Sequence, residues 1–466
     1  MKTYFFGAFA LMMACTVCSQ SSDFAGHWVG RLNANEFPVD IVMHVNESPD
    51  GNFSCVIDIP GQFEDYKADT TYLSSDTLIF EWLLSQTAFK GVLESEDRMQ
   101  GTWSTRGNVS PILFERSADG IYRRPQEPRG KPAYEVQEVS FTSASDPNVT
   151  LAGTLTLPKG IDVYPAVVLI TGSGAQDRNE AVHGHKPFLV LADRLTKAGI
   201  AVLRFDDRGT AKSTGSYEGA TTEDFANDAL GAVAFLKNQD LPITRIGLMG
   251  HTEGGSAGMI AASENSDIAF LILLATVGIK HEDLLVSQTV SALSNAGTAE
   301  HLIRIDTQYT RKLYRNMNTW SPDDPDTSAV RSLLSDFYDQ SDLIKTRFRN
   351  FETFYERQMD MMTTPWFHFY ATFDPAEYLS KVSCPVLALN GSDDIQVVAD
   401  TNLEAIERIL TKSKKSFNHK IMKLDGLNHY FQPAEGEYGH EYALIMTTFD
   451  ESAMQAINDW ILYLNQ

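Results

Sequence analysis

Short apolar runs alternate with helix-like segments through the middle of the chain, and this alternation constrains the fold more than any other feature. Strands that are apolar throughout are buried on both faces, which is typical of a parallel sheet covered by helices on each side. The sequence therefore predicts an α/β core. The runs are residues 166–170, 201–205, 245–249 and 269–274, and the helix-like segments between the first three are 188–198 and 222–236.

The same core continues on both sides of these runs. Residues 136–142 and 149–157 have the pattern of an antiparallel strand pair, and strand-like runs return at 385–389 and 420–424. Between about 281 and 378 the strand signal disappears and the sequence becomes helical. We therefore expect a core of 136–280 and 379–466, interrupted by a helical cap at 281–378.

The predicted cap is rich in aromatic and methionine side chains. Two interpretations stay open: these side chains line an acyl or aryl pocket, or they pack the cap onto the core. The set comprises Phe348, Phe351, Phe354, Tyr355, Met359, Met361, Met362, Trp366, Phe367, Phe369 and Tyr370.

Residues 20–120 are predicted to form an all-β accessory domain. Val39, Ile41 and Met43 alternate with polar neighbours, which is the pattern of half-buried strands. A barrel or a sandwich fits this pattern, and the domain is either a binding module or a structural accessory. A linker rich in proline and charge, residues 121–135, follows it.

Residues 1–19 have the pattern of a signal peptide, with Lys2 followed by an apolar stretch too short to span a membrane. We expect an exported protein, periplasmic or secreted, without an integral span in the mature chain. Lipid anchoring at Cys15 or Cys18 is the alternative. The remaining cysteines, Cys55 and Cys384, are far apart in the sequence, so we expect two separate thiols.

The formal net charge is −23, from 38 Lys and Arg against 61 Asp and Glu. Such a charge repels nucleic acid and anionic lipid, so neither is an expected partner. His183 and His185 form an H-x-H without a third metal ligand, and no phosphate loop or dinucleotide motif stands in a strand–helix context. We expect neither a metal nor a cofactor.

Residues 246–255 read as a strand, a sharp turn and a helix, with Thr252 at the turn between small residues. This is the setting of a nucleophile elbow, usually G-x-S-x-G. The amide of the next residue, Glu253, would then stabilise an oxyanion at the helix N-terminus. Ser256 also fits G-x-S-x-G literally, but it should lie one turn inside the helix.

The elbow and several other motifs resemble those of bacterial α/β-hydrolases whose elbow reads G-H-S-E-G-G. The resemblance covers roughly 140–280 and 363–466, and it implies an α/β-hydrolase fold, hydrolysis of carboxylic esters of small molecules, and a triad of Thr252, Asp394 and His429. The other matching motifs are GSGAQDR at 172–178, GHKPF at 184–188, RFDDRG at 204–209, KSTG at 212–215, NGSDDIQ at 390–396 and GLNH at 426–429.

The order and position of these residues agree with that triad. Asp394 follows the run 385–389 and His429 follows 420–424, so both should lie at the carboxyl edge of the sheet beside the elbow. His429 would take the nucleophile's proton, and Asp394 would fix the imidazole tautomer. Asp393 is a rival for the acid.

The loop after residue 170 should supply the second oxyanion donor, from the amide of Ser173, Gly174 or Ala175. Charged residues nearby have two interpretations. Asp177, Arg178 and Arg208 either bind substrate or form ion pairs that hold the loops.

Thr252 departs from the serine of the motif. An elbow nucleophile usually has φ > 0, which strains a β-branched residue, and the extra methyl group restricts χ1. We therefore expect impaired ester hydrolysis. The alternatives are a catalytically degenerate hydrolase that acts as a binding protein, and a peptidase of the same fold, although no motif for a free N-terminus is present.

Overall fold

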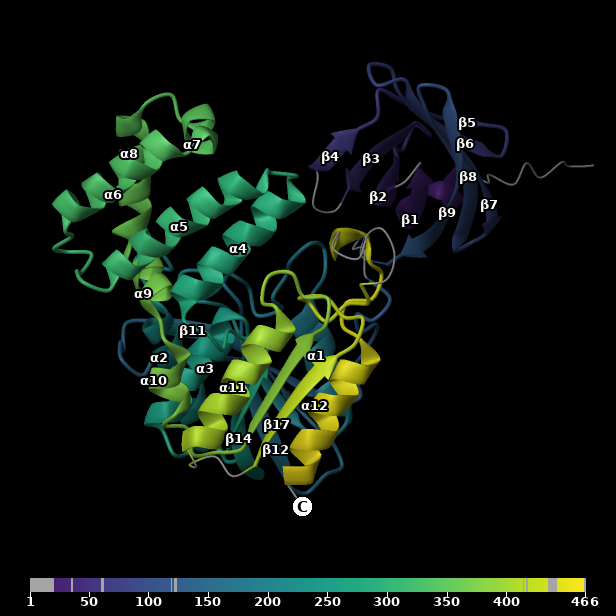
Figure 1. The fold of residues 1–466 in the computed structure, drawn as a ribbon. Coiled ribbons are helices and arrows are strands. Elements are labelled where there is room, and N and C mark those ends of the chain that lie inside the picture. Colours follow the sequence, from purple (N-terminus) through teal and green to yellow (C-terminus); the bar gives the residue numbers. More distant parts are fainter. Residues whose placement is uncertain are drawn as a thin grey trace, which may run out of the picture. The chain divides into compact units, whose positions relative to one another are not determined.

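The computed structural model describes residues 21–34, 37–59, 63–118, 120, 124–413, 415, 418–434 and 442–464. They belong to two compact units, Met1–Arg123 and Arg124–Gln466, each described here by itself (Figure 1). The predicted signal peptide, with Cys15 and Cys18, lies outside the described residues. None of the described helices combines the length and hydrophobicity needed to cross a bilayer.

The first unit is all-β, as predicted, and consists of one nine-stranded antiparallel sheet ordered β4-β3-β2-β1-β9-β8-β7-β6-β5. Aromatic side chains such as Trp28, Phe80 and Phe114 fill its inner face, and β3 contacts β5 near the two ends of the order. The sheet is a half-barrel, not a sandwich. The strands are β1 (Gly26–Ala34), β2 (Phe37–Glu47), β3 (Phe53–Ile59), β4 (Phe63–Lys67), β5 (Thr70–Ser74), β6 (Thr77–Trp82), β7 (Thr87–Ser95), β8 (Arg98–Thr105) and β9 (Asn108–Ser117).

The second unit contains an eight-stranded mixed sheet ordered β10-β11-β13-β12-β14-β15-β16-β17. The predicted antiparallel pair β10–β11 is confirmed, and the strands from β13 to β17 are parallel, as the apolar runs predict. The strands are β10 (Glu135–Thr142), β11 (Thr150–Leu157), β12 (Tyr164–Ile170), β13 (Ala201–Phe205), β14 (Ile243–His251), β15 (Phe270–Leu274), β16 (Val386–Gly391) and β17 (His419–Leu424).

Helices cover both faces of this sheet. The apolar side chains of α1 and α12 pack on one face, and those of α2, α3 and α11 pack on the other. This is the α/β-hydrolase arrangement expected from strands buried on both sides. The helices are α1 (Pro187–Lys197), α2 (Thr222–Lys237), α3 (Glu253–Glu264), α11 (Ala399–Ser413) and α12 (Glu451–Leu464). A 3₁₀ turn at Tyr442–Leu444 belongs to this unit, and another at Ser21–Phe24 belongs to the first.

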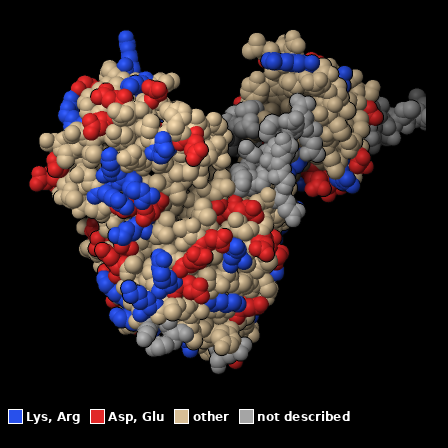
Figure 2. Space-filling view, in the orientation of Figure 1, with Lys and Arg blue, Asp and Glu red and all other residues tan. Residues whose placement is uncertain are grey.

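Helices replace strands between β15 and β16, as the sequence predicts, and most of them gather at one end of the core (Figure 1). Figure 2 shows basic and acidic side chains interspersed over this unit on the face seen, so the negative charge is not gathered into one patch there. The cap helices are α4 (His281–Asn295), α5 (Glu300–Met317), α6 (Thr327–Gln340), α7 (Asp342–Arg347), α8 (Phe351–Met362), α9 (Pro365–Thr372) and α10 (Pro375–Leu379).

Candidate active site

Thr252 lies at the turn between β14 and α3, with φ 47° and ψ −110°. This conformation is a genuine outlier for a β-branched residue and costs on the order of 1–3 kcal/mol. The surrounding glycines make the turn possible. A Cβ on Gly250 would lie 2.1 Å from the carbonyl carbon of Gly254, and one on Gly254 would lie 2.2 Å from the backbone oxygen of Ile170.

Asp394 and His429 meet at the carboxyl ends of β16 and β17. The Nδ1 of His429 lies 2.8 Å from a carboxylate oxygen of Asp394, and both residues are buried. The other oxygen of Asp394 accepts hydrogen bonds from the amides of Gln396 and Val397, at 2.8 and 2.9 Å. These amides fix the carboxylate in the orientation that contacts the imidazole.

The rival acid, Asp393, has a different environment. It is exposed, and its carboxylate accepts a hydrogen bond from the Ser392 hydroxyl at 2.9 Å. The geometry therefore favours Asp394 as the partner of His429.

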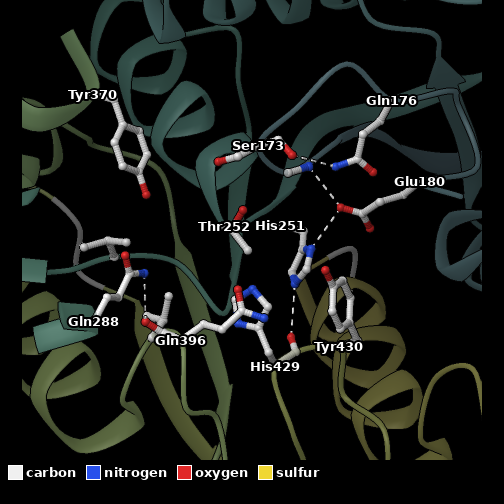
Figure 3. A pocket seen from close by; sticks show the side chains of 13 residues that line it. Ser173, Gln176, Glu180, His251, Thr252, Gln288, Tyr370, Gln396, His429 and Tyr430 are labelled. Atoms are coloured by element: carbon white, nitrogen blue, oxygen red, sulfur yellow. Dashed lines mark hydrogen bonds and ion pairs between the residues drawn. The ribbon is translucent and has the colours of Figure 1, made fainter. Parts of the chain in front are cut away.

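Thr252 and His429 line the same cavity. The hydroxyl oxygen of Thr252 is 2.8 Å from where a Cβ on Gly172 would lie. Figure 3 shows this oxygen on the Ser173 side of the cavity and the methyl group on the side of His429. A rotation about χ1 would be needed to turn the hydroxyl toward the imidazole, and β-branching restricts that rotation.

The backbone amides around Thr252 have unequal freedom to bind an oxyanion. The Glu253 amide is at the first position of α3, where an amide has no partner within the helix. The Gly172 amide donates to Glu180 Oε1, and the Gly174 amide donates to the hydroxyl oxygen of Tyr217, both at 2.9 Å. Of the three candidate donors in this loop, Gly174 is thus engaged elsewhere, and Ser173, unlike Gly174 and Ala175, lines the cavity.

A buried ion pair that the sequence analysis missed joins three loops of the site. Glu180 Oε1, which binds the Gly172 amide, also lies 2.9 Å from Nδ1 of His251, and His251 Nε2 lies 3.1 Å from the backbone oxygen of His429. Both ring nitrogens face acceptors, so the imidazole needs two protons. Burial works against that charge, but Glu180 and the His429 carbonyl outweigh it and raise the pKa of His251.

The cavity above Thr252 has a volume of about 110 Å³. Ser173 and Gln176 come from the core, Gln288 from α4, Tyr370 from α9 and Gln396 from the loop after β16 (Figure 3). Its lining is therefore largely polar and neutral.

Most of the aromatic and methionine side chains of the cap do not reach the cavity. Phe354, Met362 and Phe367 are buried in the cap's own cluster, and their aromatic and methionine neighbours pack against it. Of the set named from the sequence, Tyr370 lines the cavity. Among the described residues, the cap therefore uses most of this set to hold its helices together, which favours the packing interpretation, with Tyr370 as the member that lines the cavity.

The side chain of Glu253 links the elbow to the cap. Its Oε1 accepts hydrogen bonds from the hydroxyl of Thr222 at 2.7 Å and from Trp366 Nε1 at 2.9 Å. Burial raises the pKa of this carboxyl, and hydrogen bonds from Thr222, Ser173 and Trp366 partly offset that effect. Trp366 stacks on Tyr370 at 5.2 Å between ring centroids, so this contact also positions a residue of the cavity wall.

The charged residues near the loops form ion pairs and turn contacts. Arg178 binds Asp206 at 2.7 Å, and Arg208 binds Asp228 at 2.7 Å. The carboxylate of Asp177 accepts from the amides of Asn179 and Ala181. This supports the interpretation that they hold the loops.

The other residues singled out from the sequence, Ser256, His183 and His185, are not part of the Thr252, Asp394 and His429 set. Ser256 is buried within α3, as its spacing predicts. His185 contacts the hydroxyl of Thr448 and the backbone oxygen of Tyr442, and His183 packs against Tyr430. Among the described residues, no group of three or more His, Cys, Asp or Glu side chains is placed to hold a metal ion.

The parallel sheet, the strained elbow and the buried aspartate–histidine pair define an esterase-like α/β-hydrolase. A family model described as serine aminopeptidase, S33, matches residues 183–423, which is 241 of the 466 residues. The chain therefore belongs to this family.

A curated relative and two solved structures show similarity to this chain. Esterase EstD of Thermotoga maritima is 25% identical over 340 residues, covering 72% of this chain and 69% of the relative. Est1E of Butyrivibrio proteoclasticus, solved with ferulic acid bound, is 18% identical with a TM-score of 0.39, and covers 70% of this chain and 99% of its own. The Pyrococcus furiosus esterase Pf2001 is 16% identical with a TM-score of 0.43, over 74% and 99%.

Proposed function

We propose that this chain hydrolyses carboxylic esters through an acyl-enzyme on Thr252, with His429 as the base and Asp394 as its orienting acid. The observation that carries the proposal is the buried Asp394–His429 contact of 2.8 Å in the cavity that also holds the elbow residue. The similarity to Esterase EstD supports the same reaction class.

Acylation begins when the Thr252 oxygen attacks the ester carbonyl carbon and its proton passes to Nε2 of His429. Negative charge then develops on the carbonyl oxygen, where the amides of Glu253 and Ser173 are the candidate donors. The intermediate collapses, the bond to the alcohol oxygen breaks, and His429 protonates that oxygen. Asp394 keeps the proton on Nδ1 of His429 and stabilises the imidazolium.

Deacylation repeats these steps with water. His429 removes a proton from a water molecule, whose oxygen attacks the acyl carbon. The bond to the Thr252 oxygen breaks, His429 returns the proton to that oxygen, and the carboxylic acid leaves. The methyl group of Thr252 crowds the attack path and strains the turn, so we expect slow turnover.

Ligand binding without turnover is a second candidate function. The hydroxyl of Thr252 makes no hydrogen bond to any described residue, and its methyl group lies toward the base (Figure 3). A peptidase that binds a free N-terminus would instead need an uncompensated carboxylate in the cavity. The acidic residue among the described lining, Glu180, is paired with His251.

Hydrolysis of 4-nitrophenyl acetate by wild type and Thr252→Ala tests the proposal, together with mass spectrometry of the rapidly quenched enzyme. We expect slow release of the phenol by wild type, an acetyl group on the peptide that contains Thr252, and neither signal in the alanine variant. Equal activity of the two proteins would contradict the proposal, and absence of turnover would favour the binding function.

A further inference from the structure

The side chains that line the cavity above Thr252 restrict which substrate the site can bind. Its volume of about 110 Å³ is well below the roughly 300–1,000 Å³ of pockets that bury drug-sized ligands. An acetyl-sized group fits beside Thr252, whereas a long acyl chain would extend out of the cavity. The polar side chains must then contact the groups nearest to the ester.

Three glutamines of the lining already use their amide nitrogens inside the protein. Gln176 donates to the backbone oxygen of Ser173 at 3.1 Å, Gln288 donates to that of Gln396 at 3.2 Å, and Gln396 donates to the hydroxyl of Tyr442 at 3.1 Å. Each nitrogen keeps a second N–H, so an amide that faces the cavity can accept a hydrogen bond at its oxygen and donate one at its nitrogen.

The amides of Gln288 and Gln396 are the ones placed to meet a ligand. The oxygen of Gln176 is buried without a hydrogen-bond partner among the described residues, and Figure 3 shows it on the side of its residue away from Thr252. Gln288 and Gln396 line the cavity with partly exposed side chains. Figure 3 shows the hydroxyl group of Tyr370 also directed into the cavity, where it can donate or accept.

The charge of the lining limits what the donor can be. Glu180 is paired with His251, so its charge is compensated, and the described lining contains no other Asp, Glu, Lys or Arg. An ammonium group would be desolvated here without an unpaired carboxylate, which is unfavourable. Neutral hydroxyl groups, which both donate and accept, match the amides and the charge.

Taking the ester hydrolysis proposed above as given, we propose that the substrate is a short-chain acyl ester, of acetyl size, of a neutral polyhydroxylated alcohol such as a carbohydrate. The acyl group occupies the small space beside Thr252. The hydroxyl groups of the alcohol form hydrogen bonds with the side-chain amides of Gln288 and Gln396.

Calorimetric binding to Thr252→Ala tests the ligand class without relying on turnover. The two probes are an acetylated methyl glucoside and hexyl acetate, which share the acyl group and differ in the alcohol. We expect the glucoside to bind at least about tenfold more tightly, because its hydroxyl groups form hydrogen bonds that the hexyl group cannot form. Equal binding, or tighter binding of hexyl acetate, would overturn the proposed class.

Gln288→Met and Gln396→Met test these amide contacts, each in the Thr252→Ala background. We expect each to weaken glucoside binding about tenfold and to leave hexyl acetate unchanged. Gln239→Met is the matched control, since Gln239 is exposed and also donates to a backbone oxygen, that of Phe235. Loss of glucoside binding in the control alone would contradict the assignment.

Turnover by Thr252→Ser separates this inference from the proposed function. Hydrolysis of hexyl acetate without preference for the acetylated glucoside would overturn the substrate class and leave ester hydrolysis intact. Binding of the glucoside without hydrolysis of either ester would support the ligand class and overturn the proposed function.

Discussion

Nδ1 of His429 and a carboxylate oxygen of Asp394 lie 2.8 Å apart in a buried setting at the end of two adjacent parallel strands. Such a contact fixes the tautomer of the imidazole and leaves its other nitrogen free to exchange a proton. In the proposed mechanism, it gives the site a base that is ready for acyl transfer, next to a nucleophile that is poorly suited to it.

Replacement of the acid tests this pair. Asp394→Asn, made in a Thr252→Ser background so that rates are measurable, should lower kcat by about 10²–10⁴-fold, because the imidazole loses its orientation and charge partner. Asp393→Asn is the control and should retain activity, since that exposed carboxylate binds Ser392. Steady-state kinetics with 4-nitrophenyl acetate distinguishes the two, and a larger loss in Asp393→Asn would reverse the assignment.

The strain at Thr252 predicts that a glycine at this position raises stability, although it removes the proposed nucleophile. Thr252→Gly removes the cost of φ 47° for a β-branched residue and should raise the free energy of unfolding by about 1 kcal/mol. Thr346→Gly, in the short helix α7, should lower it by a similar amount. Urea denaturation monitored by circular dichroism measures both. Destabilisation by Thr252→Gly would show that the turn stores no strain.

The Glu180–His251 pair is predicted to hold the loops that carry Gly172 and His429 in position. His251→Gln should cost on the order of 3–5 kcal/mol of stability, because it leaves the Glu180 carboxylate buried without its charge partner. It should also lower kcat by about 10²-fold in a Thr252→Ser background, with KM little changed, because the loops carrying Gly172 and His429 lose a common anchor. A loss of stability with kcat unchanged would reduce the pair to a structural role.

His281, at the start of the cap, predicts how stability depends on pH. Burial lowers its pKa to about 3, so the folded protein keeps this imidazole neutral. The unfolded chain takes up a proton near pH 6.5, so stability is lost as the pH falls from about 6.5 toward 3. His281→Phe should reduce this loss in melting temperatures measured between pH 7 and 4. An unchanged pH profile would show that His281 does not contribute.

Much of the core could be predicted because its signals are local. The parallel strands are continuous apolar runs, and Asp394 and His429 each follow one of them, so the sheet itself brings the two residues to one edge. The elbow could be recognised from the small residues around Thr252, since a Cβ at Gly250 or Gly254 would overlap the backbone.

Other parts of the site depend on contacts that sequence spacing does not encode. Glu180 and His251 are 71 residues apart and meet because the loop that carries Glu180 packs against the end of β14. Gln288 and Gln396 belong to the cap and the core, so their contact required the packing of one on the other. The aromatic set of the cap was ambiguous for the same reason, because its periodicity does not tell which helix covers which face.

Thr252→Ser, compared with wild type in kcat/KM for 4-nitrophenyl acetate, tests the central claim most directly. If the hydroxyl at this bend is the nucleophile, removal of the methyl group should raise kcat/KM by about 10- to 100-fold, which corresponds to roughly 1.4–2.7 kcal/mol of the barrier. A folded serine variant that is no faster than wild type would contradict the account.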